Sequence, residues 1–369
     1  MLRVAWDNSL AGLDKAGTGV YAARLLEQLA NRSDLHMDVL DGWRFSRRES
    51  LATAVLRTAG NLFWTHAGLP TLLWQRGSDL LHAPAFVAPI ASPCPVVTTI
   101  HDITYLLYPS HFSNWWTAYL KLVMPPVVRS AAAIICPSEN SKRDIVKAYS
   151  IGSDKIRVVP QGVDHERFHP GATLEHGWAL ALGIRSGYVL HVGTLSYRKN
   201  IPTLLHAVAD LRARGTWGDR QVILAGSQNL SLKGAHEVFE TIRDLDLNGT
   251  VVLTGHMPDE QVPGLYAHAS MLVVPSLYEG FGFPVLEAMA TGTPVVCSDT
   301  SSLPEVAGDA AIFFPPHDRY ALASAIENLI QNPSIAEQLR RKGFERARQF
   351  TWQRTAEQTI AIYREVAKS

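Results

Sequence analysis

The sequence contains little cysteine and has no excess charge of either sign. Its three cysteines, Cys94, Cys136 and Cys297, are odd in number and far apart. This pattern argues against a disulfide framework or a zinc site and favours reduced thiols in a cytoplasmic protein. Lysine plus arginine equals aspartate plus glutamate, at 34 each, so no basic field predicts nucleic acid as a partner.

Long apolar runs are missing as well. No stretch reaches the roughly 18 apolar residues that a membrane-spanning helix requires. The opening residues, "MLRVAWDNSL", lack the apolar region of a signal peptide. We therefore expect a cytoplasmic location, and the 369 residues and 47% apolar content predict a globular chain of two or three domains.

Short apolar runs alternate with helical patterns along most of the chain. In "TGVYAARLLEQLA" the helical spacing falls on Val20, Ala23, Leu26 and Ala30. The predicted strands are "LRVAWD", "PVVTTIH", "AAAIICPS", "IRVVPQGV", "GYVLHVGT", "QVILAGS", "TVVLTGH", "MLVVPS", "TPVVCSD" and "AAIFF". This alternation predicts parallel sheets with helices on both faces. The strands are too many for one sheet, so we expect two doubly wound α/β domains, 1–170 and 171–352, with a ligand in the cleft between them.

The stretch "EGFGFPVLEAMATGTP" combines two acids with a glycine-rich turn and a helix. Pro284 suits the first helical turn and Gly292 suits the C-terminal cap, so Glu279 precedes the helix and Glu287 lies one turn inside it. Glycines and a helix N-terminus favour phosphate, but carboxylates repel it, so these acids are suited to accepting hydrogen bonds from sugar hydroxyls. A capping Glu287 and a solvated Glu279 remain the structural alternative.

Glu279 and Glu287, with seven residues between them, resemble the E-x7-E motif of the retaining, GT-B-type glycosyltransferases of family 4. Four further segments match that family in order and spacing: "TIHDITYLLYPSHF", "VVPQGVDHERFHP", "GTLSYRKNIPTLLHAV" and the run from "TGHMPDEQ" to "EVAGDAA". The resemblance covers nearly the whole chain and is weakest at about residues 40–75. It implies two Rossmann-like domains and transfer of a sugar from a nucleotide-sugar with retention of configuration.

The resemblance also implies roles for particular residues around the donor. Glu287 would bind the ribose, and Glu279 with the backbone of Gly280, Phe281 and Gly282 would hold the donor sugar. Arg198 and Lys199 would stabilise the leaving diphosphate. Many relatives carry an arginine directly after the glycine that corresponds to Gly193; here Thr194 stands there, so the arginine role passes to Arg198.

Other donor-site residues come from more distant segments. The resemblance implies that the loop of Gly17 and Gly19 closes over the diphosphate. It places the base near His256 and Met257 through backbone contacts. His101 would contact the transferred sugar near its anomeric centre, and Asp102 would orient a loop or contact the acceptor. Strand–helix turns and a buried histidine also have ordinary structural explanations.

The donor and the reaction class are less constrained by the sequence. The spellings "GTLxxRKN" and "TIHDxTxLxxP" favour GDP-mannose or GDP-rhamnose, with UDP- and dTDP-sugars as alternatives. Helix dipoles and cations would replace a metal, and the histidines show no ligating spacing such as H-E-x-x-H, so we expect no metal and no cofactor. A sugar-nucleotide epimerase, a phosphorylase and a silent binding subunit are the other classes considered.

Two regions suggest contacts beyond the donor site. The last helix, about 353–369, has apolar positions at Ala356, Ile360 and Tyr363, and the resemblance implies that it packs back on the N-terminal domain, which would bind a saccharide or lipid-linked saccharide acceptor. Aromatic residues and arginines in the N-terminal half suggest peripheral contact with the inner face of the cytoplasmic membrane, although an aromatic stripe is often core. The aromatic residues are Phe63, Trp64, Trp74, Phe112, Trp115, Trp116 and Tyr119, with Leu120 and Val123 beside them, and the arginines are Arg44, Arg47 and Arg48.

Overall fold

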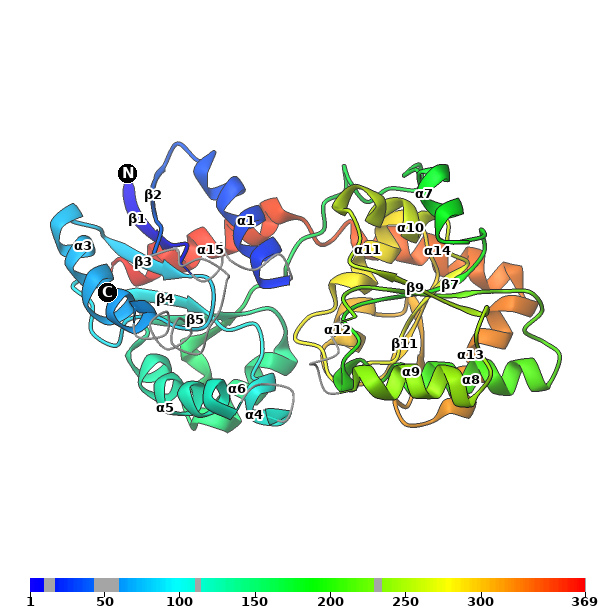
Figure 1. Cartoon of the computed structure of the whole chain (residues 1–369). Helices are drawn as coiled ribbons and strands as arrows, with labels where there is room; N and C mark the ends of the chain where they lie inside the picture. The colour runs from blue at the N-terminus through cyan, green and yellow to red at the C-terminus, as the bar shows by residue number, and fades with distance from the viewer. Residues whose placement is uncertain (10–16, 43–59, 110–113, 229–233, 369) are drawn as a thin grey trace. The chain divides into compact units, whose positions relative to one another are not determined.

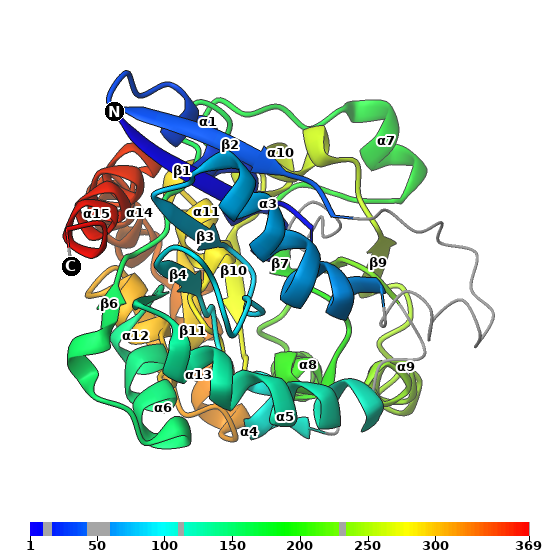
Figure 2. The ribbon, with the colours of Figure 1, turned by 90° about the vertical axis from the view of Figure 1, so that its left-hand side faces the viewer.

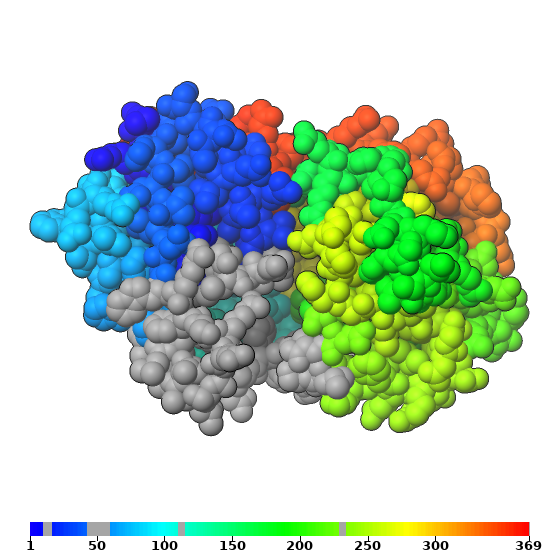
Figure 3. All heavy atoms as spheres, turned by 45° about the horizontal axis from the view of Figure 1, so that its top comes forward, coloured from blue at the N-terminus to red at the C-terminus, as the bar shows by residue number. Residues whose placement is uncertain are grey.

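The computed structural model describes residues 1–9, 17–42, 60–109, 114–228 and 234–368, and these divide into two compact units (Figure 1). Unit 1 contains the described residues of 1–107, 113–162 and 352–368, and unit 2 contains 108–109 and the described residues of 163–351. Figure 3 draws the described chain as coloured spheres. Within these ranges no helix is both long and apolar enough to cross a membrane.

Unit 1 is built on a parallel sheet whose strands follow the order β2-β1-β3-β4-β5-β6. Its strands are β1 (Leu2–Asp7), β2 (Leu35–Leu40), β3 (Leu80–Ala83), β4 (Val96–Thr99), β5 (Ala133–Cys136) and β6 (Ile156–Val158). The central strands β3, β4 and β5 are buried along their whole length, as expected for a parallel sheet covered on both faces.

Two of these strands, β2 and β3, are absent from the sequence-based prediction. β2 is an edge strand whose middle residues reach the surface, so "LHMDVL" lacks the continuous apolar run of a buried strand. β3 is four residues long and includes the polar His82. Tertiary pairing with β1 and β4 defines β3, and local composition does not.

The helices of unit 1 begin with α1 (Gly17–Ala30). The helix is confirmed, but its predicted stripe is not the buried one. Val20, Ala23 and Ala30 are exposed, whereas Tyr21, Ala22, Leu25 and Leu29 are buried. The apolar residues of this helix lie on several of its sides, so the helical period fits more than one apolar stripe. The remaining helices are the π-helical turn Trp64–Gly68, α3 (Leu69–Arg76), α4 (Thr104–Leu107), α5 (Asn114–Ser130) and α6 (Glu139–Tyr149).

The final helix, α15 (Trp352–Val366), belongs to unit 1 although the chain reaches it through unit 2. It lies beside α1 in Figures 1 and 2, and buries Ile360, Tyr363 and Val366. The Tyr363 hydroxyl contacts Nδ1 of the buried His82 in β3. Burial and, to a lesser extent, the nearby His101 together lower the pKa of His82 to about 3, so the α15 contact involves a neutral imidazole.

Unit 2 contains a second parallel sheet, ordered β12-β11-β10-β7-β8-β9. Its strands are β7 (Val189–Val192), β8 (Val222–Ala225), β9 (Val251–Gly255), β10 (Met271–Val274), β11 (Val295–Ser298) and β12 (Ala311–Phe314). Alternate strand residues enter two separate cores: Leu190 and Leu272 face one, and Val189 and Val273 face the other. This alternation follows from the two-residue period of a strand.

Helices cover both faces of the unit 2 sheet. α8 (Ile201–Ala213), α9 (Ala235–Asp244) and α13 (Arg319–Gln331) cover one face, and α10 (Val262–Ala267) and α11 (Phe283–Thr291) cover the other (Figure 1). The remaining helices are α7 (His176–Ala181), α12 (Leu303–Ala307) and α14 (Pro333–Ala347). The two parallel α/β sheets predicted from the sequence are therefore confirmed.

The aromatic segments of unit 1 divide between core and surface. Trp64, Leu120 and Val123 are buried, so assigning them to a membrane-facing surface is wrong, because their side chains fill the core. Trp74 is 75% exposed and Trp115 is 49% exposed. Phe63 is also exposed, whereas Arg44, Arg47, Arg48 and Phe112 lie outside the described residues.

Candidate active site

The strand order of unit 2 reverses between β10 and β7. At such a switch point the loops after the two strands diverge, and ligands of open α/β sheets bind in the crevice this leaves. The loop after β7 carries Arg198 and Lys199, and the loop after β10 carries Glu279. The chain therefore brings two cations and one acid to one edge of the sheet.

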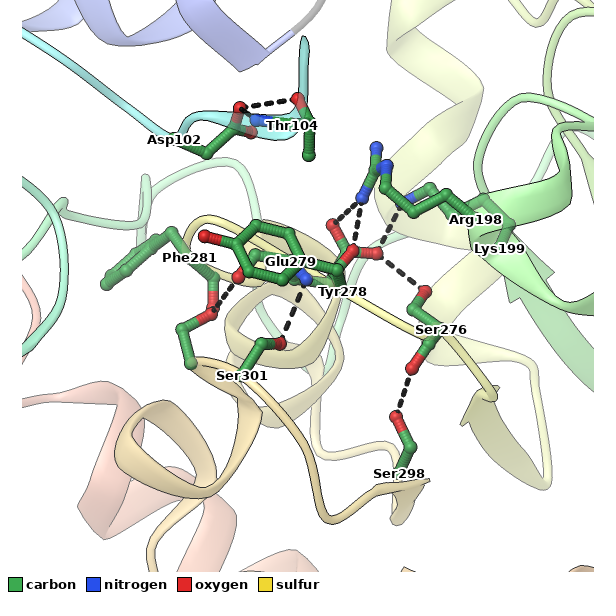
Figure 4. Close-up of polar contacts among 11 residues, drawn as sticks. Asp102, Thr104, Arg198, Lys199, Ser276, Tyr278, Glu279, Phe281, Ser298 and Ser301 are labelled. Atoms are coloured by element: carbon green, nitrogen blue, oxygen red, sulfur yellow. Dashed lines mark hydrogen bonds and ion pairs between the residues drawn. The ribbon is translucent and has the colours of Figure 1, made fainter. Parts of the chain in front are cut away.

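The three side chains are bonded to one another (Figure 4). Lys199 Nζ donates to Glu279 Oε1 at 2.7 Å, and Arg198 donates to Oε2 at 2.8 Å. Ser276 Oγ donates to Oε1 at 2.6 Å. Glu279 and Lys199 are each 7% exposed, so the alternative of a solvated Glu279 is wrong.

The charges of this cluster determine its ionisation. Burial raises the pKa of Glu279, but Lys199, Arg198 and the hydrogen bonds from Lys199 and Ser276 outweigh burial, and the pKa lies well below its usual value. Glu279 is therefore a carboxylate at any physiological pH. Within the three side chains two positive charges face one negative charge, so the cluster carries a net positive charge suited to an anion.

Close backbone approach requires glycine beside this cluster. Gly193 has φ +155°, and a Cβ there would lie 2.9 Å from Lys199 Cε. A Cβ on Gly226 would lie 2.2 Å from the carbonyl oxygen of Gly193. Because neither glycine has a Cβ, the Lys199 side chain can pack against the end of β7. The neighbouring Thr194 is exposed.

Asn200 links the two loops and was missed by the sequence analysis. Its Nδ2 donates to Pro275 O at 2.9 Å and to Pro316 O at 2.6 Å, while its Oδ1 accepts from Thr203 Oγ1. Asn200 has φ +52°, a left-handed conformation that asparagine tolerates better than most residues. Its place directly after Arg198 and Lys199 was the available signal.

The glycine loop leads into α11 as predicted. Gly282, with φ +121°, precedes the helix, Pro284 lies in its first turn, and Gly292, with φ +78°, ends it. Gly280 and Gly282 are buried. The Phe281 ring packs on Phe350 and Phe283, so its side chain belongs to the core.

Glu287 has a different environment from Glu279. Its Oε2 accepts a hydrogen bond from Tyr266 Oη at 2.8 Å, and no side chain caps α11, so the capping alternative is wrong. Burial raises the pKa of Glu287 although Tyr266 and Arg167 lower it. The two glutamates therefore have opposite shifts, and Tyr266 is a second residue that the sequence analysis missed.

His101 lies in unit 1, directly after β4. Its Nε2 lies 3.1 Å from Pro84 O, its Nδ1 lies 3.0 Å from Gln161 Nε2, and its ring meets Tyr21 edge-on at 4.8 Å. A carbonyl accepts and an amide nitrogen donates, so the proton is on Nε2 and the imidazole is neutral. Gln161, buried in the "VVPQGV" segment, was not predicted.

The remaining predicted residues are dispersed. Asp102 Oδ1 accepts from the backbone N–H and hydroxyl of Thr104, so it orders the start of α4. Gly17 and Gly19 begin α1, and residues 10–16 before them lie outside the description. The Met257 side chain lies in a core of unit 2, and His256 is exposed.

Two doubly wound sheets, with paired cations and a carboxylate at a switch point, define a two-domain α/β protein whose site suits an anion and hydroxyl groups. Residues 180–346 match the family model of glycosyl transferases group 1, and residues 16–167 match that of glycosyltransferase family 4. Together the two matches span most of the chain. The chain therefore belongs to these glycosyltransferases.

Individual relatives agree with this assignment. O-antigen chain mannosyltransferase B of Escherichia coli is 32% identical over 77% of this chain and 74% of its own. The MMP alpha-(1->4)-mannosyltransferase of Mycolicibacterium hassiacum is 31% identical over 67% of this chain and 57% of its own.

Solved structures show the same fold. Sucrose-phosphate synthase of Thermosynechococcus elongatus has a TM-score of 0.76 at 21% identity, over the whole of both chains. Anabaena HepE, solved in complex with UDP and glucose, has a TM-score of 0.74 at 19% identity, over 99% of this chain and all of its own. The predicted GT-B fold class of two Rossmann-like domains is confirmed.

Proposed function

We propose that this glycosyltransferase moves a hexose of the mannose or rhamnose type from a nucleotide-diphosphate sugar, with retention of configuration. The favoured donor is a GDP-sugar. The acceptor is a saccharide or lipid-linked saccharide in surface polysaccharide assembly. The observation that carries the proposal is the Lys199–Glu279–Arg198 cluster at the switch point of unit 2. It combines two cations that suit a diphosphate with a carboxylate that can accept hydrogen bonds from sugar hydroxyls.

Each residue of the cluster, and of the segments beside it in unit 2, has a proposed task. Arg198 and Lys199 stabilise the charge that develops on the departing diphosphate. Glu279 and the backbone of Gly280, Phe281 and Gly282 hold the donor sugar. Glu287 accepts the ribose hydroxyls, and the backbone at Met257 meets the base.

The other proposed contacts come from the segments around the cluster and from unit 1. Gly193 and Thr194 border the diphosphate, as do Gly17 and Gly19 at the start of α1. His101 contacts the transferred sugar. Its neutral ring is consistent with hydrogen bonding to an uncharged sugar rather than with ion pairing.

The proposed chemistry is front-face substitution. The bond between the anomeric carbon and the diphosphate oxygen breaks, the acceptor oxygen bonds the same face of that carbon, and the departing phosphate takes the acceptor's proton. Arg198 and Lys199 lower the energy of this path by stabilising the phosphate charge as the bond breaks. The cluster itself supplies no carboxylate for a covalent intermediate, because Glu279 is held by both cations.

The donor base is the first property to measure. The names of the mannosyltransferase relatives favour mannose as the transferred sugar. The spellings "GTLxxRKN" and "TIHDxTxLxxP" favour GDP as its carrier, whereas the UDP complex of the Anabaena structure keeps a UDP-sugar as the alternative. Calorimetric titration with GDP, UDP and dTDP ranks the bases, and nucleotide release from the corresponding sugars identifies the donor. Tighter binding of UDP than of GDP would overturn the GDP assignment.

An epimerase is the second candidate reaction on this fold. It converts one sugar nucleotide into another and releases no nucleotide. Chromatography of the products after incubation with each donor therefore separates the two reactions. A new sugar nucleotide without free GDP or UDP would exclude the transferase.

We also propose a cytoplasmic location with peripheral contact between unit 1 and anionic lipid. The exposed Phe63, Trp74 and Trp115 side chains support this contact, since aromatic rings suit the interface of a bilayer. Each arginine that comes near the lipid surface would add about 1 kcal/mol. Wild-type protein that stays in the supernatant with anionic vesicles at low salt would contradict it, as would unchanged binding after Arg44, Arg47 and Arg48 are replaced by glutamate.

A further inference from the structure

Serine hydroxyls contact every polar group of Glu279. Ser276 Oγ donates to the carboxylate at 2.6 Å. The Glu279 backbone N–H donates to Ser301 Oγ at 2.9 Å, and Ser302 Oγ lies 2.8 Å from the Glu279 carbonyl oxygen. Figure 4 shows Ser276 and Ser301 on either side of Glu279. Three hydroxyls from two segments therefore restrain one residue.

We propose that Ser276, Ser301 and Ser302 are positioning residues for the transfer reaction. They hold Glu279, and through it Lys199 and Arg198, in the geometry that receives the donor. This inference rests on the proposed role of Glu279 in holding the donor sugar. It assigns a task to serines that are not part of the E-x7-E motif.

Ser276, which contacts the Glu279 carboxylate, is itself held by a further hydrogen bond. Ser276 is fully buried, and its own carbonyl oxygen accepts a hydrogen bond from Ser298 Oγ at 2.5 Å. Ser298 ends β11, so the neighbouring strand holds the residue that holds Glu279. A hydrogen bond to a carboxylate in a dry site is strong and directional, which fixes the rotation of the Glu279 carboxylate.

Ser301 adopts an unusual backbone conformation at its contact. Its φ is +54°, a left-handed conformation that disfavours residues with a Cβ. Only glycine adopts it without this cost. The serine that stands here accepts the Glu279 N–H, so its hydroxyl compensates for an unfavourable backbone.

Ser302 directs its hydroxyl away from its own helix. It occupies the N-cap position of α12, where a serine side chain usually accepts a backbone N–H of that helix. Here it makes no such bond. Its hydroxyl instead lies 2.8 Å from the carbonyl oxygen of Glu279 and 2.6 Å from that of Phe281, and so holds the chain on both sides of Gly280.

The test compares Ser276→Ala, Ser301→Gly and Ser302→Ala with a matched control, Ser270→Ala. The Ser270 hydroxyl also donates to a backbone carbonyl in unit 2, that of Tyr188 at 2.9 Å, but it lies outside the cluster. Four quantities are measured for each variant: melting temperature, nucleotide affinity by calorimetry, kcat and KM. Amide exchange at Glu279 reports the loop without requiring activity.

For Ser276→Ala we expect kcat to fall about 10- to 100-fold, because one hydrogen bond to a buried charge is lost. Free nucleotide should bind within about twofold of wild type, since Glu287 is untouched. Ser301→Gly should keep its melting temperature, because glycine relieves the backbone cost. It should exchange the Glu279 amide faster and lower kcat about tenfold. Ser270→Ala should match wild type in kcat.

Three results would overturn the inference. The first is wild-type kcat and KM in both Ser276→Ala and Ser301→Gly. The second is faster amide exchange at Glu279 with unchanged kcat, because the serines would then order the loop without affecting transfer. The third is a parallel fall of melting temperature and nucleotide affinity in the variants. Wild-type protein that acts on no donor would instead overturn the proposed function, and this inference would fall with it.

Discussion

The two sheets of this protein share a plan but differ in strand order and in the chemistry at their switch points. Counted from its own first strand, the unit 2 sheet runs 6-5-4-1-2-3, which is the Rossmann order, whereas the unit 1 sheet runs 2-1-3-4-5-6, which begins like flavodoxin. The switch point lies between the first and fourth strands in unit 2, and between the first and third strands in unit 1.

Charge distinguishes the candidate residues of the two units. In unit 2, Arg198, Lys199 and Glu279 form a buried ionic cluster. In unit 1, His101 is neutral and contacts the amide of Gln161, the Pro84 carbonyl oxygen and the rings of Tyr21 and Phe86. Charged side chains therefore gather at the switch point of unit 2, whereas the printed contacts of the His101 ring in unit 1 are with uncharged groups.

The largest expected effect tests whether α15 completes unit 1. Deleting residues 353–369 removes Ile360, Ile362, Tyr363 and Val366 from its core. Each buried side chain of this kind contributes about 1.5–3 kcal/mol, and together they approach the roughly 5–15 kcal/mol of a whole domain. Calorimetry should show the unit 1 transition lost and the unit 2 transition kept.

Deletion of Ala367–Ser369 is the matched control, because these residues follow α15. It should leave both transitions in place. If the longer deletion melts and turns over like wild type, α15 is not part of the stability of unit 1.

The next effect tests the ionic character of the unit 2 site. Lys199→Ala should lower the rate by about two to three powers of ten, because one donor to the developing phosphate charge is lost. Lys342→Ala is the control, since its ammonium pairs with Asp309 on the surface of the same unit. Single-turnover kinetics with the identified donor measures both, and near-normal turnover of the Lys199 variant would remove it from the mechanism.

A smaller effect distinguishes the two glutamates by pH. Nucleotide affinity should weaken as the pH falls through the raised pKa of Glu287, because the protonated acid accepts ribose hydroxyls poorly. Glu279 stays ionised over the same range. Glu287→Gln should bind nucleotide about tenfold more weakly and lose the pH dependence.

Tyr266→Phe sharpens this prediction. The Tyr266 hydroxyl lowers the pKa of Glu287, so its removal should shift the affinity loss to higher pH. Tyr188→Phe, which removes a hydroxyl bonded to Leu265 O, should not move it. The stability of unit 2 depends on pH in the opposite direction from the nucleotide affinity. Because the pKa of Glu287 is higher in the folded state than in the unfolded state, the stability that Glu287 contributes is lost as the pH rises from the unfolded pKa through the folded one.

The smallest effect concerns the surface of α15. Arg364 pairs with Asp34 at an exposed position, where water and salt screen the two charges, so the pair contributes little to stability. Arg364→Ala should therefore lower the unit 1 melting temperature by no more than a few degrees. A loss as large as that of the deletion would mean that the ion pair, and not the buried face, attaches α15.

Local sequence signals are sufficient to predict the type of fold and the position of the two glutamates relative to α11. Buried apolar runs identify most strands, and Pro284 and Gly292 place the ends of α11, because these signals depend on residues close together in the chain. The same two residues placed Glu279 before the helix and Glu287 within it.

The residues that surround those acids depend on how the chain folds in three dimensions. Lys199 and Glu279 are 80 positions apart, and Ser301 and Ser302 follow Glu279 by 22 and 23. No periodicity connects such positions, because a hydrogen bond across two loops depends on the strand order that brings the loops together. The same reason hid β3, the buried stripe of α1 and the contact between Gln161 and His101: each is selected by its partners in space.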